Sequence, residues 1–210
     1  MSHQSNTPLL VLGTGNRKKG LELVELLAPL GLRLETLADY PQALAVDENG
    51  DSFAANARLK ATGQARHLGR WVLGEDSGLA VDALGGAPGI HSARYSGPNA
   101  SDEANNRRLL AQLGDTPLER RTAHYVCHVT ISDPAGNVRA ESEATCQGRI
   151  RREPAGSGGF GYDPLFEIVE YHRTFGELGP AVKSILSHRA RAVALTLVPL
   201  MQLAGSGEWK

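Results

Sequence analysis

The chain has 210 residues, of which 41% are hydrophobic and 21% are charged, and its 22 basic and 23 acidic side chains leave a net charge of −1. This length and composition predict a globular domain that buries its own core without disulfides or a structural metal, and they argue against intrinsic disorder. A charge so close to zero also disfavours nonspecific nucleic-acid binding and attachment to an anionic membrane surface.

The cysteines and the apolar runs bound the cellular setting. Cys127 and Cys146 are the two cysteines, and neither belongs to a CxxC pair, so we expect a reducing cytoplasm rather than a disulfide framework or a zinc site. No apolar run approaches the roughly 18 residues of a membrane span, and the N-terminal segment, residues 1–8, is short and polar. Export and membrane insertion are therefore not expected.

The first third of the chain predicts a β-α-β unit followed by a second helix and strand. Residues 9–12 form an apolar run that ends at a glycine-rich loop, residues 13–16, and apolar positions then recur at helical spacing until Gly31. Residues 32–37 alternate as a strand does. Ser52 is a predicted N-cap of a helix to about His67, and residues 71–74 predict a buried strand that ends at Glu75–Gly78.

The rest of the chain predicts a mixed sheet. Residues 85–98 are too rich in glycine and proline for a regular element, and Ser101 is expected to cap the next helix. Residues 122–131 and 138–146 predict a hairpin around a turn at 133–137. A glycine cluster at 156–164 precedes a short apolar segment, 165–168, and a last helix is expected over about 187–203. The prediction is one α/β domain, residues 1–210, with helices flanking the sheet.

The glycine loop with the basic residues after it has two readings. Glycines between a strand and a helix expose backbone N–H groups at a helix N-terminus, where phosphate oxygens bind well. The alternative is a tight turn with solvated lysines. Lys18 stands where a dinucleotide fingerprint needs its third glycine, but Glu35 lies 20 residues after Gly15, as a ribose-binding acid would. A nicotinamide-dependent enzyme therefore stays open as a rival.

Acidic residues form the second candidate group. Glu75 and Asp76 are adjacent, and an extended backbone directs at most one of them into a cleft. With Glu48, they offer the hard oxygen ligands that Mg²⁺ prefers when it also binds phosphates. The alternative is a capped, solvated turn.

A third group lies at the start of the predicted last helix. Residues 183–189 gather cations and hydroxyls where acidic side chains usually stand, which favours an anionic ligand there. The alternative is a Ser187 N-cap with His188 and Arg189 facing outward. His124 and His128 share the metal-ligand spacing of a strand face, but cross-strand packing explains them better than zinc.

Taken together, these motifs resemble the Ham1-like inosine and xanthosine triphosphate pyrophosphatases over nearly the whole chain. The stretches that carry the resemblance are Thr14–Asn16 with Lys19, Ser52–Phe53 with Asn56–Ala57 and Lys60, Glu75–Leu79, Gly86–Ile90, Ser92–Tyr95, Gly159–Pro164, and Lys183 with Ser187–Arg189. The resemblance implies an elongated mixed sheet with flanking helices, two lobes around a nucleotide-binding cleft, a homodimer, and Mg²⁺-dependent cleavage of ITP, dITP or XTP into the monophosphate and pyrophosphate.

The resemblance also implies roles for individual residues. Asp76 matches the base that activates water, and Glu48 and Asp76 match the Mg²⁺ ligands. Substrate-binding positions are implied at Thr14, Gly15, Asn16, Arg17, Lys18, Lys19 and Lys60 for the triphosphate, with Lys183 as a further phosphate cation, at Ser77 for the base or sugar, and at Phe160, Gly161, Tyr162, Asp163, His188 and Arg189 for the purine.

Two departures from the family pattern stand out. Ala55 replaces a glutamate that many members carry, and the region of Cys146 lacks a tryptophan found in some relatives. The first is expected to loosen the surroundings of the metal, and the second to alter the base pocket. A purine-nucleotide sensor without turnover stays open as an alternative, although Glu48 and Asp76 argue against it.

Overall fold

A computed structural model describes residues 7–209, which form two compact units. The first unit comprises the chain up to Asp76, His128–Glu143 and the chain from Ala192; the second comprises Ser77–Cys127 and Ala144–Arg191. The strands are β1 (Leu9–Leu12), β2 (Arg33–Thr36), β3 (Trp71–Val81), β4 (Thr122–Ser132), β5 (Val138–Ile150), β6 (Phe166–Ile168) and β7 (Arg173–Thr174). The α-helices are α1 (Arg17–Leu27), α2 (Phe53–Leu68), α3 (Asp102–Leu113), α4 (Phe175–Leu186) and α5 (His188–Gly205). Among these described residues, no helix combines the length and apolar character needed to cross a membrane.

The seven strands form one mixed sheet in the order β2-β1-β3-β4-β5-β6-β7. β1 pairs in parallel with both β2 and β3, with Leu10 opposite Leu34 on one side and Trp71 on the other. β5 pairs antiparallel with β6, and β6 antiparallel with β7. The α/β class and the mixed sheet predicted from the sequence are thus confirmed.

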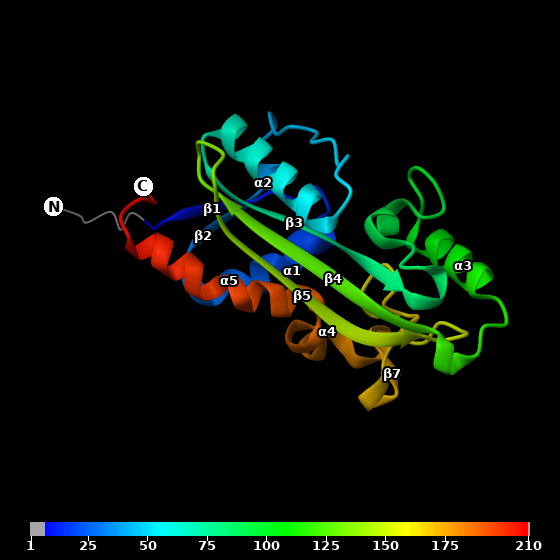
Figure 1. The fold of residues 1–210 in the computed structure, drawn as a ribbon. Coiled ribbons are helices and arrows are strands. Elements are labelled where there is room, and N and C mark those ends of the chain that lie inside the picture. The colour runs from blue at the N-terminus through cyan, green and yellow to red at the C-terminus, as the bar shows by residue number, and fades with distance from the viewer. Residues whose placement is uncertain (1–6, 210) are drawn as a thin grey trace. The chain divides into compact units, whose positions relative to one another are not determined.

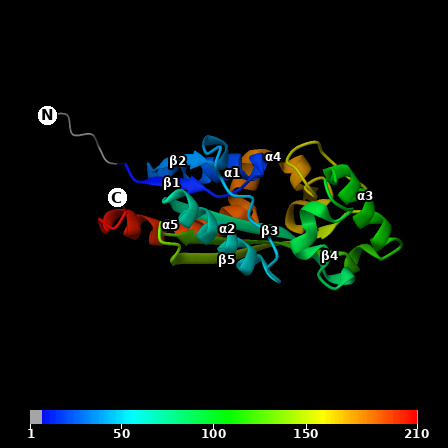
Figure 2. The same ribbon diagram turned by 90° about the horizontal axis from the view of Figure 1, so that it is seen from above.

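In the first unit, helices cover both faces of the sheet. The chain passes from β1 to β2 through α1 and back across β1 to β3 through α2. Because both crossovers are right-handed by preference and run in opposite directions, they place α1 and α2 on opposite faces. Figures 1 and 2 show this arrangement, with α5 on the same face as α1.

Helix α2 lies very close to β3 because Gly74 has no side chain. A Cβ atom at Gly74 would stand 2.4 Å from the carbonyl oxygen of Ala57 and 2.6 Å from the backbone nitrogen of Ala61. The buried residues of α2 include both alanines, so small side chains on both elements permit the approach. This contact brings the polar residues of α2 up to the middle of β3.

Glu208 and Trp209, near the C-terminus, pack against one end of the first unit. The Trp209 ring stacks on Trp71 of β3 with 4.6 Å between ring centroids, and its Nε1 donates to the carbonyl oxygen of Leu9 at 3.0 Å. Arg139 of β5 lies over the Trp71 ring at 5.5 Å and pairs with Glu208 at 2.5 Å. Sequence reasoning did not foresee this contact.

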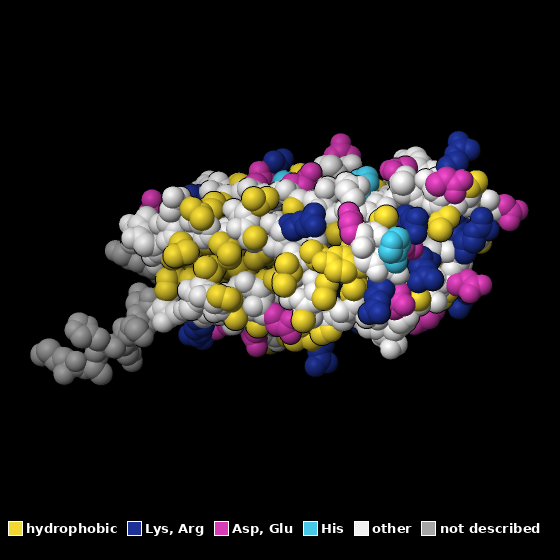
Figure 3. Space-filling view, turned by 90° about the horizontal axis from the view of Figure 1, so that it is seen from below, with side chains coloured by type: hydrophobic (Ala, Val, Ile, Leu, Met, Phe, Trp, Pro, Cys, Tyr) yellow, Lys and Arg dark blue, Asp and Glu magenta, His cyan; other side chains and the backbone are white. Residues whose placement is uncertain are grey.

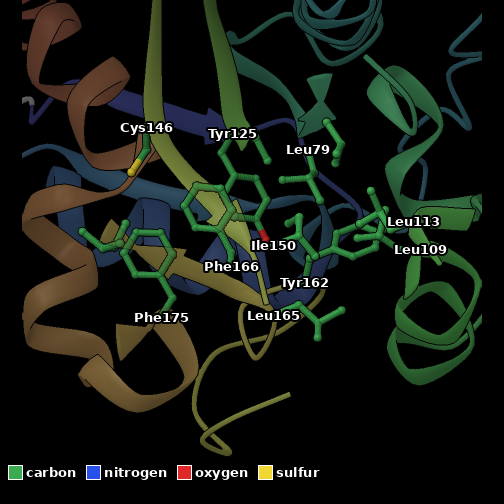
Figure 4. Packing of buried hydrophobic residues seen from close by; sticks show 13 residues of the cluster. Leu79, Leu109, Leu113, Tyr125, Cys146, Ile150, Tyr162, Leu165, Phe166 and Phe175 are labelled. Atoms are coloured by element: carbon green, nitrogen blue, oxygen red, sulfur yellow. The ribbon is translucent and has the colours of Figure 1, made fainter. Parts of the chain in front are cut away.

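The second unit has its own aromatic core. Figure 4 shows Tyr125 and Phe166 at its centre, with Leu109 of α3 on one side and Phe175 of α4 on the other. The Tyr125 and Phe166 ring centroids are 4.6 Å apart, and those of Phe166 and Phe175 are 5.6 Å apart. Offset and tilted ring pairs of this kind stabilise a core beyond the area that they bury.

One predicted boundary is wrong, and one helix was not predicted. β3 continues through Glu75 and Asp76 to Val81 instead of ending at Glu75, because its residues are buried along nearly its whole length. The last helix, expected over about 187–203, is confirmed as α5, and a further helix that the sequence did not predict, α4, precedes it and ends just before Ser187, which leaves the helical conformation. Lys183 therefore lies in the last turn of α4, where a cation suits the helix dipole, and not at the start of the last helix. Ser187 does cap α5, as its Oγ accepts the N–H of Ala190 at 3.2 Å.

Candidate active site

The glycine loop of the first unit is built around Asn16. Its Oδ1 accepts the N–H groups of Lys18 and Lys19 at 3.0 and 3.2 Å, so Asn16 caps α1. The side chain of Thr14 accepts the N–H of Asn16 at 3.2 Å. Residues 15–18 are exposed and Gly15 has open space around it, whereas Gly13 packs against β3. The loop thus combines a rigid backbone with exposed basic side chains at a helix N-terminus, an arrangement suited to phosphate groups.

Glu75 and Asp76 each meet a different lysine. The Nζ of Lys19, on α1, lies 3.2 Å from Oε2 of Glu75, and the Nζ of Lys60, on α2, lies 2.8 Å from Oδ1 of Asp76. Successive side chains of a strand point to opposite faces, and α1 and α2 cover opposite faces, so the two pairs follow from the topology. The alternative of a capped, solvated turn is excluded, since Glu75 and Asp76 are 1% and 6% exposed.

Glu48 and Asp76 converge on one cation. The Nζ of Lys60 lies 3.1 Å from Oε2 of Glu48 and 2.8 Å from Oδ1 of Asp76, so both carboxylates face the same point. Glu48 comes from the segment before α2, which the structure brings to β3. Two carboxylates directed at one cation, one of them half-exposed, fit Mg²⁺, which usually takes few protein ligands and fills the remaining positions with water and substrate phosphate.

Burial and these charges set the protonation of the pair. Burial raises the pKa of Asp76 above its ordinary value, while Lys60 and Lys19 act in the opposite direction. Burial alone would lower the pKa of Lys60, but the carboxylates of Asp76, Glu75 and Glu48 raise it, so Lys60 is a cation. A carboxylate with a raised pKa is a better proton acceptor than a surface aspartate, which suits the role implied for Asp76.

Asn56 ties the two carboxylate-bearing segments together. Its Nδ2 donates to Oδ2 of Asp76 at 3.4 Å, and its Oδ1 accepts the N–H of Gly50 at 2.9 Å. The side chain is 1% exposed, and a Cβ at Gly50 would stand 2.8 Å from its Oδ1. Asn56 thus holds the segment of Glu48 against Asp76, a role that its place in a sequence motif did not reveal.

Ala55 has a local explanation in the same region. It is the third residue of α2, and its N–H donates to Oγ of the N-cap Ser52 at 3.2 Å. A glutamate at this position would complete a capping box with Ser52, so the departure from the family pattern removes half of a helix cap. Its Cβ also occupies the space that a Cβ at Gly50 would need.

In the second unit, Asp163 organises the glycine cluster. Its Oδ2 accepts the N–H of Phe160 at 2.8 Å and pairs with Nζ of Lys183 at 2.6 Å, and its Oδ1 accepts the hydroxyl of Tyr125 at 3.4 Å. The carboxylate is buried, and a Cβ at Gly159 would collide with it. Asp163 is therefore placed to shape the loop.

Two cations accompany the ring of Phe160. The Nζ of Lys183 lies 4.2 Å from its centroid and the guanidinium carbon of Arg189 lies 5.9 Å from it. A cation over an aromatic face is attracted by the ring, and an aromatic ring also suits stacking of a purine base. Lys183, predicted as a phosphate cation, is thus placed beside the predicted base-binding residues.

Arg189, His188 and Ser77 complete this group. The Nη2 of Arg189 donates to Oγ of Ser77 at 2.9 Å, and the His188 ring stacks on Tyr125 with 4.5 Å between centroids. Arg189 and His188 are 2% and 4% exposed, which excludes the alternative in which they face outward. Tyr162 is also buried, and its hydroxyl donates to the carbonyl oxygen of Ser92 at 2.9 Å.

The acid proposed for ribose binding has other partners. Glu35 pairs with Arg33 at 2.5 Å and accepts the hydroxyl of Tyr40. These contacts hold its carboxylate beside β2, and its backbone lies opposite Val11 of β1. The local contacts account for Glu35 without a nicotinamide cofactor.

Comparison with known proteins gives the class. Residues 10–197 match the sequence model of the Ham1 family, and the chain belongs to this family. It is 55% identical over 197 residues to a dITP/XTP pyrophosphatase of Rhodopirellula baltica, covering 94% of this chain and 95% of that protein.

Solved structures of similar proteins show the same fold. A HAM1 protein from Coxiella burnetii matches with a TM-score of 0.83 and 32% identity, and the match covers 93% of this chain and 100% of that chain. A nucleoside-triphosphatase, or dITP/XTP pyrophosphatase, from Mycobacterium abscessus matches with a TM-score of 0.73 and 42% identity, covering 91% and 99%.

Proposed function

We propose that this protein hydrolyses inosine and xanthosine triphosphates, including dITP, to the nucleoside monophosphate and pyrophosphate. The observation that carries the proposal is the convergence of Glu48 and Asp76 on one cation position beside the capped, lysine-bearing loop of the first unit. The curated relatives named dITP/XTP pyrophosphatase support the substrate class. Removal of such nucleotides from the cellular pool is the role that follows.

The proposed reaction is attack of water on the α-phosphorus. The water oxygen forms a bond to this phosphorus, the bond from the α-phosphorus to the bridging oxygen breaks, and pyrophosphate leaves. Asp76 accepts the proton of the attacking water, and its raised pKa favours this transfer. Lys19, Lys60 and the loop from Thr14 to Lys18 hold the phosphates, since compact ammonium groups suit such point contacts.

We propose Mg²⁺ as the cofactor, held by Glu48 and Asp76. When bound, it would neutralise charge on the triphosphate. The place at which it fits is the one that the ammonium of Lys60 now shares with both carboxylates, so Lys60 is expected to turn toward the phosphates when the metal binds. Asn56 would hold the carboxylate of Asp76 and the backbone at Gly50, two residues after Glu48, through this change.

The residues of the second unit are proposed to bind the purine. Phe160 offers a stacking face, and Lys183 and Arg189 offer donors to a 6-oxo group. Adenine carries a 6-amino donor instead, so it would leave buried donors unpaired, which disfavours it strongly.

A product assay tests the proposal. Purified protein is incubated with ITP, XTP, GTP or ATP, with and without Mg²⁺, and pyrophosphate is measured separately from orthophosphate. We expect pyrophosphate from ITP and XTP, little from GTP or ATP, and none after chelation of the metal. Tight ITP binding without turnover would favour a nucleotide sensor, and orthophosphate alone would move the cleaved bond along the phosphate chain.

We also propose a homodimer that works in a reducing cytoplasm. Leu195, Val198 and Met201 of α5 are 59%, 63% and 64% exposed, and Figure 3 shows hydrophobic side chains gathered on the face where α5 lies. A stripe of this kind favours contact with a second copy. Light scattering should give a dimer mass, and Val198→Glu should give a monomer, whereas Leu59→Glu on α2 should not. Cys127 and Cys146 are buried and form no disulfide, which is compatible with a reducing cytoplasm.

A further inference from the structure

Two side chains of helix α3 hold the glycine loop of the second unit, residues 156–164, through hydrogen bonds; this contact is called the grip on Gly161. Oδ2 of Asp102 accepts the N–H of Gly161 at 2.9 Å, and Nδ2 of Asn106 donates to the carbonyl oxygen of the same Gly161 at 3.0 Å. Asp102 and Asn106 are four residues apart and so lie on one face of the helix. Both polar groups of one residue's backbone are thereby held by neighbouring turns of a single helix.

The helix is a firm support for this grip. Its N-terminus is capped by Ser101, whose Oγ accepts the N–H of Ala104 at 3.2 Å. Farther along, Leu109 and Leu113 are buried in the aromatic core of the unit, at 0% and 2% exposure. Asp102 and Asn106 therefore extend from a packed element to a loop that has little regular structure of its own.

The loop is held at two neighbouring residues, Phe160 and Gly161. Gly161 has φ +62°, in the left-handed region that glycine adopts readily. Phe160, the residue before it, is held by different contacts. The N–H of Phe160 is held by Asp163 at 2.8 Å, and the carbonyl oxygen of Phe160 accepts the N–H of Asp163 at 3.2 Å. Asp163 thus fixes the loop from within, and the helix fixes its tip at Gly161.

We propose that Asp102 and Asn106 are positioning residues for purine recognition. By holding Gly161, they set the height and tilt of the Phe160 ring relative to the cations of Lys183 and Arg189. The inference rests on the proposed function, because it assigns the Phe160 face to the purine. Its consequence is selectivity: donors discriminate a 6-oxo group only when the stacked ring is held in register with them.

Four substitutions test the proposal. Asp102→Ala and Asn106→Ala each remove one hydrogen bond to Gly161. Asp102→Asn is the conservative rescue, since its amide oxygen still accepts an N–H. Glu103→Ala is the matched control, because Glu103 is an exposed acid in the same first turn of α3 and its removal changes charge and helix dipole equally. Melting temperatures confirm that each variant is folded.

The kinetic readout separates positioning from simple stability. For both alanine variants we expect KM for ITP to rise about tenfold, the factor of one lost hydrogen bond, while kcat stays within about twofold. The ratio of kcat/KM for ITP over GTP should fall by about the same factor. Asp102→Asn and Glu103→Ala should behave like the unchanged protein. Asn106→Asp, which sets a carboxylate against the carbonyl oxygen of Gly161, should exceed Asn106→Ala in its effect.

Amide exchange of Gly161, followed by NMR, tests the grip without substrate. It should be slow in the unchanged protein and in Glu103→Ala, and faster in Asp102→Ala. Unchanged exchange, or faster exchange with unaltered KM and selectivity, would overturn the inference. Failure of the unchanged protein to bind or cleave ITP would instead remove the proposed function, and the recognition role with it, while the exchange data still showed whether α3 holds the loop.

Discussion

Two neighbouring carboxylates on β3 have different surroundings because a strand directs successive side chains to opposite faces. Glu75 meets Lys19 from α1, and Asp76 meets Lys60 from α2. Of the two, Asp76 also accepts a hydrogen bond from Asn56 and shares its lysine with Glu48. The asymmetry makes Asp76 the residue around which the catalytic proposal is built.

The substitution Asp76→Asn tests its role as base. Asparagine has nearly the same shape and keeps an oxygen that can accept from Lys60, so the melting temperature should change by only a few degrees. It cannot accept the proton of the attacking water, so kcat for ITP should fall by about 10²- to 10⁴-fold. Single-turnover measurements with saturating ITP check this result. A kcat near that of the unchanged protein would exclude Asp76 as the base.

At the scale of elements, a glycine decides how near α2 can come to β3. In Gly74→Ala the added Cβ would stand 2.4 Å from the backbone of Ala57, so the helix must move away. We expect a loss of about 1–3 kcal/mol of unfolding free energy, as overpacking usually causes. Urea denaturation measures it.

Gly63→Ala is the matched control for that change. Gly63 lies within α2 itself, and a Cβ there would meet the nearest atom, Cγ2 of Val46, at an ordinary 3.6 Å. Alanine is the better helix former by about 0.5–1 kcal/mol, so this variant should be equally stable or more stable. Equal losses from Gly74→Ala and Gly63→Ala would show that close packing against β3 is not the cause.

Another contact between elements makes the first unit sensitive to acid. Arg58 of α2 donates to both oxygens of Glu141 on β5, at 2.6 and 2.8 Å. These bonds, and those from His128 and Thr130, lower the pKa of Glu141 from 4.5 to about 2, against the effect of burial. The folded state thus binds the proton less well than the unfolded state, so the stabilisation is complete above pH 4.5 and is lost as the pH falls toward 2.

Glu141→Gln tests this dependence. Because the pair is partly exposed and screened by solvent, the variant should lose only about 1 kcal/mol of unfolding free energy at pH 7. Denaturation curves at several pH values should show the two proteins converging as the pH falls from about 4.5 toward 2, the range over which folding no longer favours the ionised form of Glu141. A constant difference across that range would mean that the charge of Glu141 does not contribute.

Sequence patterns identified most elements and failed where long-range contacts decide. The glycine loop, α2, α3 and the hairpin of β4 and β5 follow from local signals such as Asn16, Ser52 and Ser101. β3 continues past Glu75 where its residues are buried, and that burial depends on contacts with segments distant in sequence. The site was recognised through its motifs, but the grip on Gly161 and the bridge at Asn56 are hydrogen bonds across the fold that no local spacing indicates.

At the scale of the whole molecule, the chain passes between its two units four times, because each unit is assembled from separate segments. β3, β4 and β5 each contribute residues to both units. Loss of these strands' pairing in one unit removes support from the same strands in the other. The topology therefore favours common unfolding over independent unfolding.

Calorimetry tests this expectation. Heating should give one transition whose calorimetric enthalpy equals its van't Hoff enthalpy. Substitutions in either unit, such as Gly74→Ala in the first, should then shift the whole transition. Two resolved peaks, one of which is insensitive to Gly74→Ala, would show that the units unfold separately.

The stacked pair of Trp71 and Trp209 determines what tryptophan fluorescence and circular dichroism can detect in this protein. The chain has two tryptophans, and both lie in this contact, with ring centroids 4.6 Å apart. Tryptophan fluorescence therefore comes from one end of the first unit, and the coupled indoles should add an exciton band to the circular dichroism spectrum. None of the residues proposed to bind the nucleotide belongs to this stacked pair, so both signals should change little on binding, and a titration needs a reporter placed beside those residues.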